Sequence, residues 1–412
     1  MNFIDICSGI GGFRSALEMN GHNCLAFAEI DKYAKQSYRA IYDTEGEDEL
    51  DDITAITDEH FRLYKGQCDI ITGGFPCQAF SIAGNRRGFD DTRGTIFFHI
   101  ARAIKEIQPS YVLLENVKGL FSHDKGRTFG TIIQALDELG YVTEWGLFNS
   151  KYWGVPQNRE RVYILVTRKD KFKGPVLFDL LKQQTEVTTR LIDVLEDEVD
   201  EKYYLSEEKT KKLTLDFNLT VDEEPRISIV ENTSRTNYYA ANIYDPNGLS
   251  TTVAARDYMG PKQIVIPVLT PDRVNKRQNG RRFKEDGEPM FTLTSQDKHG
   301  IAIREATKQG YAVAERGDSV NVSYPTSKTR RGRVGKQVAQ TLQAGEVNQG
   351  VVMNDIRIRK LVPIETWRLQ GFSDEQFYKA KNSGVSNSQL YKQAGNSVTV
   401  NVVDAIVKKL KE

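Results

Sequence analysis

The chain has 412 residues, is 39% hydrophobic and carries 56 basic and 56 acidic side chains, so its formal net charge at pH 7 is zero. This length exceeds one average domain and the apolar content is ordinary, which excludes a disordered chain. The four cysteines and five histidines lack the paired spacing of a zinc site, and no signal peptide or apolar run of membrane length occurs, so we expect a cytoplasmic protein without a metal or a membrane partner.

The first predicted element is a strand over residues 3–6, which passes into a glycine-rich turn and then into a helix that begins near Arg14. Glycines allow the backbone to approach a ligand closely. Glu29, the first acidic residue after the next predicted strand, falls near the spacing of a ribose-binding carboxylate. The turn departs from the G-x-G-x-x-G pattern and no P-loop lysine follows it, so the pattern favours S-adenosyl-L-methionine over NAD and ATP.

A cysteine follows the predicted strand over residues 69–71, in the sequence Gly-Gly-Phe-Pro-Cys-Gln that ends at Gln78. The glycines allow a sharp turn at the carboxyl edge of the strand, and Pro76 fixes φ so that the Cys77 thiol is presented. This pattern predicts a nucleophile, although a small buried cysteine is the commoner fate of this residue type. A thiol is only slightly ionised at neutral pH, so a nucleophilic Cys77 needs an activating charge nearby.

Charged residues flank two later predicted strands. Glu115 follows the apolar run 111–114, and Arg159 and Arg161 precede the hydrophobic strand 162–166. The two arginines can supply the positive charge that the thiol needs. Taken singly, Glu115 is better explained as a helix N-cap or a surface acid, and the two arginines as a solvated pair. The combination with Cys77 is what predicts a functional site.

In this order, the segments resemble the motifs of the DNA (cytosine-5) methyltransferases, and the resemblance extends from residue 1 to about 167. Near the C-terminus, residues 359–372 resemble the family's penultimate motif and residues 395–398 its last. The resemblance implies a sequence-specific enzyme of a bacterial or phage restriction-modification system, which transfers a methyl group from S-adenosyl-L-methionine to C5 of a cytosine in double-stranded DNA. We also expect a monomer, and a cognate restriction endonuclease that acts on the same site.

The resemblance implies catalytic roles for four residues. Cys77 would attack C6 of the cytosine and form a covalent intermediate, which makes C5 nucleophilic. Glu115 would hold the N3 and amino edge of the base, and Arg161, with Arg159 beside it, would contact O2. Because C6 is unreachable in a stacked duplex, the base must be flipped out of the helix. No side chain stands out as the base that removes the C5 proton, so water is expected there.

The resemblance also implies a cofactor site built from both ends of the chain, with the residues Gly9, Gly11, Glu29, Asp52, Ile53, Asn396 and Val398. The glycines would lie under the methionine moiety, Glu29 would bind the ribose hydroxyls and Asp52 the adenine amino group. The C-terminal residues would close the site. Cys7 stands where the family usually has phenylalanine, so an apolar wall remains but ring area is lost, and cofactor affinity is the property affected.

Two regions are expected to contact DNA. Residues 78–94 resemble the family's mobile catalytic loop, with a disordered surface loop as the alternative. Basic clusters in the variable region, from about residue 170 to 356, favour phosphate contact over a solvated face. The predicted DNA-contacting residues are Ser81, Arg86, Arg93, Arg330, Arg331 and Arg333.

The predicted elements indicate an α/β fold. A doubly wound, Rossmann-like S-adenosylmethionine-dependent methyltransferase domain is expected over residues 1–170, completed by residues 386–412. A smaller β-rich target-recognition domain is expected as an insert over residues 171–385. DNA would lie between the two domains, so that one supplies the chemistry and the other recognises the sequence.

Three other functions fit the sequence less well. An RNA cytosine-5 methyltransferase of the same fold would have a short variable region, and the relatives that act on transfer RNA carry a Cys-Phe-Thr tripeptide that this chain lacks. An amino-group methyltransferase would carry Asp/Asn-Pro-Pro-Tyr in place of the Cys77 segment. A DNA-binding regulator without activity would have no need of Cys77, Glu115 and Arg161 together.

Overall fold

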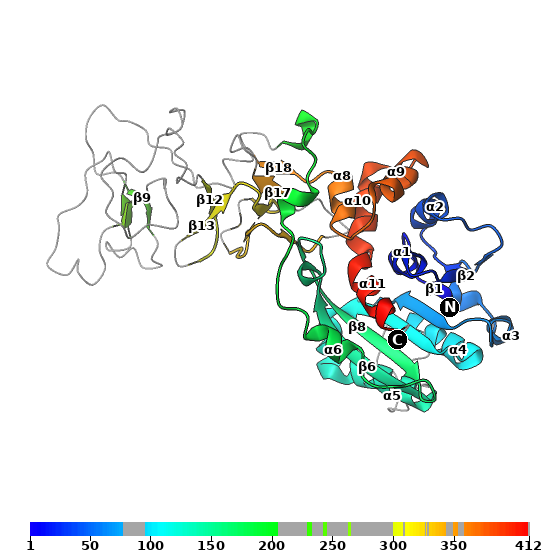
Figure 1. The fold of residues 1–412 in the computed structure, drawn as a ribbon. Helices are drawn as coiled ribbons and strands as arrows, with labels where there is room; N and C mark the ends of the chain where they lie inside the picture. Colours follow the sequence, from blue (N-terminus) through cyan, green and yellow to red (C-terminus); the bar gives the residue numbers. More distant parts are fainter. Residues whose placement is uncertain are drawn as a thin grey trace, which may run out of the picture. The chain divides into compact units, whose positions relative to one another are not determined.

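The computed structural model describes residues 1–76, 95–204, 229–232, 242–244, 263–264, 300–307, 310–325, 327, 329–342, 349–352 and 358–410. The chain forms two compact units (Figure 1). Unit 1 comprises Met1–Tyr203, Gln337–Gln349 and Lys360–Glu412, and unit 2 comprises Tyr204–Lys336 and Gly350–Arg359. None of the helices in the described residues has the length and apolar character needed to span a membrane.

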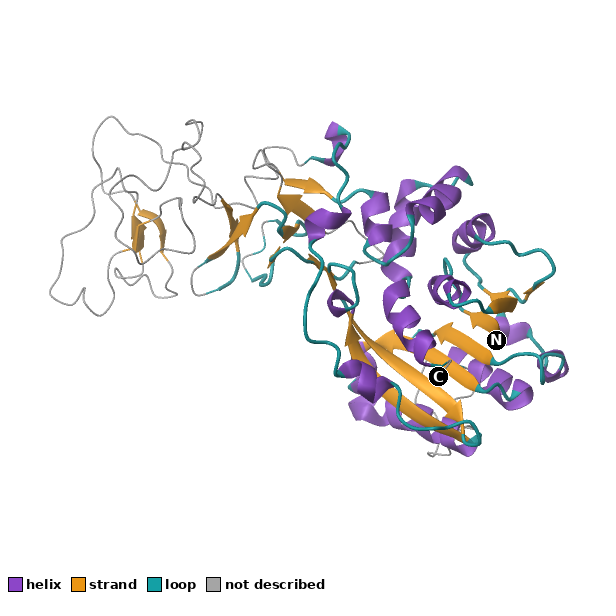
Figure 2. Cartoon of the chain, in the orientation of Figure 1, coloured by secondary structure: helices purple, strands orange, loops and turns teal. Residues whose placement is uncertain are grey.

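The centre of unit 1 is a sheet whose described strands follow the order β3-β2-β1-β4-β5-β8-β6 (Figure 2). The first five are parallel, whereas β8 runs antiparallel to both β5 and β6. Their bounds are β1 (Asn2–Ile6), β2 (Asn23–Ala28), β3 (Asp48–Glu49), β4 (Ile70–Gly74), β5 (Tyr111–Val117), β6 (Tyr141–Asn149) and β8 (Glu160–Arg168). Because the strand order reverses at β1, the carboxyl ends of β1 and β4 border the crevice where doubly wound folds bind ligands. The predicted fold class is confirmed.

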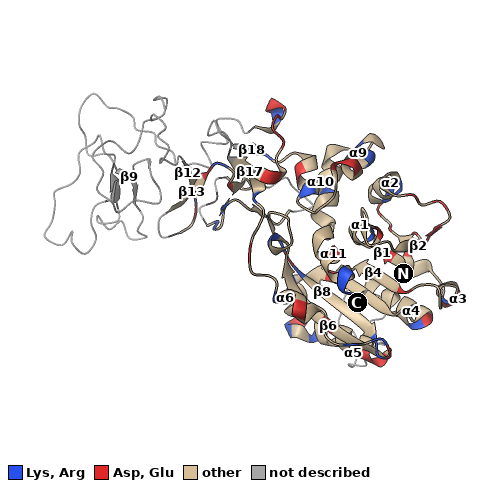
Figure 3. Cartoon of the chain, in the orientation of Figure 1, with Lys and Arg blue, Asp and Glu red and all other residues tan. Residues whose placement is uncertain are grey.

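Helices cover both faces of the sheet (Figure 2). On the face covered by α4 (Ile96–Ile107) and α5 (Arg127–Glu138), the core contains alternate strand residues such as Val112 and Leu114, because successive side chains of a strand point to opposite faces. Helix α4 begins after Thr95, whose hydroxyl accepts from the Phe98 N–H, and buries Ile100 on the same face as other apolar residues at helical spacing. Basic and acidic residues both occur on α4 and on α9 (Asp374–Asn382) (Figure 3), in keeping with the zero net charge.

The α-helices of unit 1 are α1 (Gly12–Met19), α2 (Lys32–Ile41), α3 (Asp58–Arg62), α4 (Ile96–Ile107), α5 (Arg127–Glu138), α6 (Leu177–Leu181), α8 (Pro363–Arg368), α9 (Asp374–Asn382), α10 (Asn387–Asn396) and α11 (Val400–Lys409). Short 3-10 helices are η1 (Ile53–Ala55), η4 (Lys118–Phe121), η5 (His123–Gly126), η6 (Ser150–Tyr152), η7 (Leu191–Val194) and η8 (Glu201–Tyr203). Two short strands, β7 (Gln157–Asn158) and β16 (Ala339–Gln340), pair in parallel within this unit.

The C-terminal helices pack against the N-terminal ones. Helix α11 lies against α1, where Asn20 Nδ2 donates to Asp404 Oδ1 at 2.7 Å, and α9 contacts α2. After Tyr203, unit 1 includes Gln337–Gln349 and then the whole chain from Lys360 onward, whereas the sequence analysis expected the chain to return to this domain at residue 386. The difference arises because α8, which contains the fully buried Trp367, packs on α9 and α10. Which residues recognise the DNA target stays a prediction.

The described part of unit 2 consists of strands. Strands β12 (Gly300–Arg304) and β13 (Tyr311–Glu315) form an antiparallel pair, and Ile303, Ala314 and Val320 form a small core. The sheet β15-β14-β17-β18 contains β14 (Ser319–Asn321), β15 (Val334–Gly335), β17 (Gln349–Val352) and β18 (Ile358–Lys360), and the sheet β11-β10-β9 contains β9 (Ile229–Asn232), β10 (Asn242–Tyr244) and β11 (Gln263–Ile264). These strands agree with the β-rich insert that the sequence predicts.

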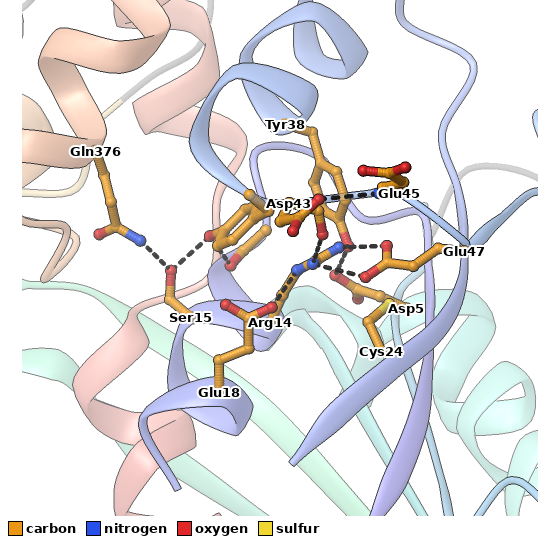
Figure 4. Close-up of polar contacts among 12 residues, drawn as sticks. Asp5, Arg14, Ser15, Glu18, Cys24, Tyr38, Asp43, Glu45, Glu47 and Gln376 are labelled. Carbon is orange, nitrogen blue, oxygen red and sulfur yellow. Dashed lines mark hydrogen bonds and ion pairs between the residues drawn. The ribbon is translucent and has the colours of Figure 1, made fainter. Parts of the chain in front are cut away.

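A buried polar network joins α1 to the segment that follows α2 (Figure 4). The Arg14 guanidinium donates to both carboxylate oxygens of Glu47, at 2.7 and 2.8 Å, and its Nε donates to Glu18 at 2.7 Å. In the same network the Tyr38 hydroxyl donates to Asp5 of β1 at 3.5 Å. Asp5 is fully buried, and burial raises the pKa of its carboxyl to about 7 despite a 2.8 Å hydrogen bond from the Thr72 hydroxyl.

The raised pKa of Asp5 predicts a pH-dependent stability. In the folded protein Asp5 keeps its proton up to about pH 7, whereas in the unfolded chain it loses the proton near the ordinary value of about 3.9. The folded state therefore binds more protons between these values, and the contribution of Asp5 to the free energy of unfolding falls by up to about 4 kcal/mol as the pH rises from 4 to 7. Urea denaturation of the parent and of Asp5→Asn at several pH values measures this fall, which the variant should lack. Parallel pH profiles would contradict it.

Candidate active site

The glycine turn after β1 is shaped by close packing. Gly9 and Gly11 have positive φ angles of 58° and 81°, which favour glycine. A Cβ at Gly11 would lie 2.4 Å from the ring of Tyr42, and one at Gly12 would lie 2.6 Å from Cγ2 of Val398. Among the described residues, no atom other than those of Gly9 and its two chain neighbours lies within 4 Å of the position of a Cβ at Gly9, so these residues leave the space beside Gly9 open. Tyr42 and Val398 thus pack closely against Gly11 and Gly12, whereas the backbone at Gly9 is accessible to a ligand.

Glu29 lies directly after β2 and turns its carboxylate toward the glycine turn. Oε2 accepts from the backbone N–H of Gly9 at 2.8 Å, and Oε1 accepts from the N–H of Asp31 at 2.7 Å. Each oxygen retains a lone pair for a ligand, because a carboxylate oxygen accepts two hydrogen bonds. The structure therefore brings Glu29 and Gly9 together, as the sequence analysis expected.

Three further residues follow the carboxyl ends of β1 and β3. Asp52 is exposed and caps η1 by accepting from the Thr54 N–H at 2.9 Å, a hydrogen bond that lowers the pKa of its carboxyl. Ile53 is buried. Burial raises the pKa of the Cys7 thiol to about 12, with Glu29 and Asp52 adding to the effect, so Cys7 is a neutral apolar wall.

Glu115 and Arg161 form an ion pair across two neighbouring strands. Arg161 Nε lies 3.1 Å from Glu115 Oε1, and the two side chains are only 16% and 12% exposed. Burial raises the pKa of Glu115, while the charges of Arg161 and Arg159 act in the opposite direction. The pair combines a carboxyl group that binds a proton readily with a fixed positive charge.

The segment that leads to the predicted nucleophile ends beside this pair. Gly74 is the register partner of Glu115 in the parallel pairing of β4 with β5. Asn116 is buried, and its Nδ2 donates to the carbonyl of Phe75 at 2.7 Å, which anchors the chain close to Cys77. Sequence reasoning missed Asn116, although its place next to Glu115 was a signal. The predicted residues Cys77, Ser81, Arg86 and Arg93 lie outside the described residues.

Arg159 has a different environment from the one expected. Its guanidinium is buried and donates to the carbonyls of Gly395 and Ser397, at 3.2 and 2.7 Å. Burial and the like charge of Arg161 lower the pKa of Arg159 to about 10. The expectation that Arg159 lies beside Arg161 as a second contact to the base does not match this geometry, because the guanidinium is buried and directed at the carbonyls of Gly395 and Ser397. Asn396, between the two carbonyls, is exposed.

The three arginines expected to contact DNA in unit 2 also differ. Arg333 is fully buried and donates to the carbonyls of Asn321, Ser323 and Tyr324, so in this structure it does not present its guanidinium to a phosphate. This corrects the sequence-based expectation, and the reason is that a guanidinium can stabilise a turn through several carbonyls. Phosphate contact by the exposed Arg331 and the half-buried Arg330 stays a prediction.

One edge of the sheet therefore combines a glycine turn, a fixed carboxylate and a largely buried ion pair, because the carboxyl ends of β1, β2 and β5 and the amino end of the antiparallel β8 lie at this edge. The whole chain, residues 1–412, matches the family model of the C-5 cytosine-specific DNA methylases. The chain belongs to this family. It is a DNA (cytosine-5) methyltransferase, which acts on DNA and uses a methyl-donor cofactor. No group of metal-ligating side chains occurs in the part of the chain that the structure describes.

Relatives from phages and bacteria match the methyltransferase along its length. The orphan methyltransferase M.SPRI of Bacillus phage SPR is 36% identical over a 477-residue alignment, which covers 100% of this chain and 97% of the relative. The orphan methyltransferase M.SPBetaI of Bacillus phage SPbeta is 35% identical, with the same two coverages. The type II methyltransferase M.BanI of Aneurinibacillus aneurinilyticus is 30% identical, and the alignment covers 100% of this chain and 95% of the relative.

Solved structures show the same fold. A putative DNA modification methyltransferase from an E. coli prophage has a TM-score of 0.56 and 19% identity, with coverage of 100% of this chain and 98% of that one. The Dnmt2 methyltransferase of S. pombe has a TM-score of 0.52 and 18% identity, with the same coverages. At this level of identity the likeness concerns the fold alone.

The contact of Asn116 with Phe75 predicts a role in catalysis. Asn116→Ala removes the donor that holds the chain before Cys77, so we expect methyl transfer to fall by up to about 100-fold, the effect of misplacing a reacting group by about 1 Å. Cofactor affinity should not change, because Asn116 does not contact the glycine turn or Glu29. Tritium transfer to DNA and calorimetric cofactor binding measure the two properties. Asn382→Ala, at an exposed position of α9, is the matched control. A variant rate within about threefold of the parent would show that Asn116 is dispensable.

Proposed function

We propose that the enzyme methylates C5 of a flipped cytosine through a covalent bond between Cys77 Sγ and C6, with S-adenosyl-L-methionine as the cofactor. The observation that carries this proposal is the largely buried Glu115–Arg161 pair, with a Nε to Oε1 distance of 3.1 Å, at the end of the strand beside the one that leads to Cys77. A cytosine placed there would have its N3 edge near a carboxyl group and its O2 near a guanidinium.

The environment of Glu115 suits the chemistry of cytosine. Attack of the Cys77 thiolate on C6 forms the Sγ–C6 bond and moves the electron pair of the C5–C6 double bond toward C5. Conjugation through the ring spreads the resulting negative charge to N3 and O2. A Glu115 carboxyl whose pKa is raised by burial can donate a proton to N3 as that charge develops. Arg161 can stabilise the charge at O2. After methyl transfer, water takes the C5 proton and the C5–H electron pair forms the C5–C6 double bond. The Sγ–C6 bond breaks with release of the Cys77 thiolate, and N3 returns its proton to the Glu115 carboxylate.

The residues of the crevice fit the proposed cofactor. The open space beside Gly9 allows a close approach to the backbone, and both oxygens of Glu29 can accept from the ribose hydroxyls. Asp52 can accept from the adenine amino group, with Ile53, Val398 and Cys7 as apolar neighbours. When bound, S-adenosyl-L-methionine supplies an electrophilic methyl group. Asn396 would close the site from the C-terminal side.

For the biological context we propose that the enzyme protects DNA against a restriction endonuclease of the same specificity. The name of the relative M.BanI, a type II methyltransferase, supports this context. The Bacillus phage relatives favour a second candidate, a modification enzyme without a partner nuclease, because they carry the name orphan methyltransferase. Whether a nuclease gene adjoins the coding sequence in its genome decides between the two contexts.

DNA that contains 5-fluorocytosine tests the covalent step. We expect an adduct with Cys77 when S-adenosyl-L-methionine is present, because fluorine at C5 cannot leave as a proton does. Burial raises the pKa of each described cysteine, Cys7, Cys24 and Cys68, so these thiols are poor nucleophiles. Peptide mass spectrometry identifies the modified residue. An adduct on one of those three cysteines, or one that survives Cys77→Ser, would overturn the assignment.

The proton donated by Glu115 is tested by Glu115→Gln. An amide cannot transfer a proton to N3, so we expect methyl transfer to fall by about 100-fold or more, within the range of a lost general acid. DNA and cofactor binding should stay close to the parent, because the interaction strengthens only as the ring is attacked. Glu144→Gln is the control, since burial also raises the pKa of Glu144, whose Oε1 caps α6. Equal rates for the two variants would exclude this role of Glu115.

A further inference from the structure

Arg159 connects the strand that carries Arg161 to the last motif of the chain. The residue lies between β7 and β8, and only 2% of its surface is exposed. Nη1 donates to the Gly395 carbonyl at 3.2 Å and Nη2 to the Ser397 carbonyl at 2.7 Å. The planar fork of a guanidinium thus spans the end of α10.

The carbonyls of Gly395 and Ser397 lie at the C-terminal end of α10 and need hydrogen-bond donors from outside the helix. The last carbonyls of a helix lack intrahelical donors, and a positive charge near them is favourable because the helix dipole is negative at that end. Arg159 supplies both the donors and the charge. Its two hydrogen bonds lie on either side of Asn396 and therefore determine the path of the backbone through residues 395–398.

The opposite side of residues 395–398 contacts the glycine turn. A Cβ at Gly12 would lie 2.6 Å from Val398 Cγ2 and 2.9 Å from Ser397 Oγ, so these residues pack directly on the start of α1. Residues 395–398 consequently lie between Arg159 and the turn. A shift of the backbone at Ser397 would change the packing on Gly12.

Buried hydroxyl and amide groups hold the same region. Thr399 Oγ1 lies 2.8 Å from Ser150 Oγ and donates to Gln370 Oε1 at 3.1 Å, and Gln370 Nε2 donates to the Ala394 carbonyl at 2.7 Å. Ser150 in turn donates its N–H to the Arg159 carbonyl at 3.0 Å. The side chain and the backbone of Arg159 are therefore parts of one hydrogen-bonded assembly.

We infer that Arg159 is a positioning residue of the cofactor pocket, which holds residues 395–398 against the glycine turn and does not contact the cytosine. The inference rests on the proposed function, in which the glycine turn and Asn396 form walls of the cofactor site. Of the two arginines, only Arg161, whose Nε faces Glu115, would contact the cytosine. In the segment from Arg159 to Arg161, one arginine thus supports the cofactor pocket and the other contacts the cytosine.

Conservative variants of the two arginines separate these roles. Lysine keeps the charge but cannot donate as a fork to two carbonyls. We expect Arg159→Lys to weaken the binding of S-adenosylhomocysteine, measured by calorimetry without DNA, by about tenfold or more, the loss expected for one hydrogen bond of a charged group. Arg161→Lys should bind this probe within about threefold of the parent. In steady-state assays, Arg159→Lys should raise the cofactor KM more than it lowers kcat, and Arg161→Lys should lower kcat at an unchanged cofactor KM.

Parental affinity of Arg159→Lys for S-adenosylhomocysteine, together with a loss of kcat, would overturn the inference and assign Arg159 to the base. Failure of the parent enzyme to methylate cytosine or to bind S-adenosylhomocysteine would instead refute the proposed function, so the two failures are distinguishable. Thermal unfolding shows whether Arg159→Lys folds. If it does not, Thr399→Val loosens the same region from the other side, and an unchanged affinity of that variant for the probe would also overturn the inference.

Discussion

The antiparallel pairing of β5 with β8 fixes the geometry of the whole active site. In this register Glu115 lies opposite Tyr163 and Val117 opposite Arg161, so Glu115 and Arg161 are diagonal neighbours on one face of the sheet. Diagonal neighbours are within reach of long side chains, which explains the ion pair. A shift of one residue would turn Arg161 to the opposite face, because side chains alternate along a strand. The long pairing of β8 with both β5 and β6 opposes such a shift.

Glu115, Arg159 and Arg161 are charged groups with little exposure to water, which costs free energy of solvation but also suits them to catalysis. Removing ions from water costs several kcal/mol for each ion, and a pair compensates this cost only when its remaining groups are hydrogen-bonded. Arg159 meets this condition in part, because Nη1 and Nη2 donate to two backbone carbonyls whereas its buried Nε has no hydrogen-bond partner among the described residues. Arg161 is held by Glu115 and by the carbonyl of Glu160 at 2.8 Å. For Glu115, the effect of burial exceeds that of the two arginine charges, so its pKa stays raised. A group that readily takes up a proton in a buried site is suited to act on a base whose charge changes during the reaction.

The return of the chain to unit 1 explains how an enzyme of this design accommodates a large insert. Contacts such as Asn20 with Asp404 and Ser150 with Thr399 join residues that are hundreds of positions apart in the sequence. The entropic cost of closing a loop grows only slowly with its length, so the size of the insert has little effect on this assembly. The sheet and its C-terminal helices can therefore keep one architecture while the residues between them vary.

The sequence by itself determined the fold class, the family and the order of the functional segments, because glycine turns, apolar runs and single charged residues at strand ends are local patterns. It also indicated Gly9 and Glu29, which the structure brings together. Tertiary structure alone decided the environments of buried cations. Arg159 and Arg333 occur in basic sequences that resemble exposed patches, yet both donate to carbonyls that folding brings to them. The anchoring role of Asn116 likewise depends on the pairing of β4 with β5, which no local pattern specifies.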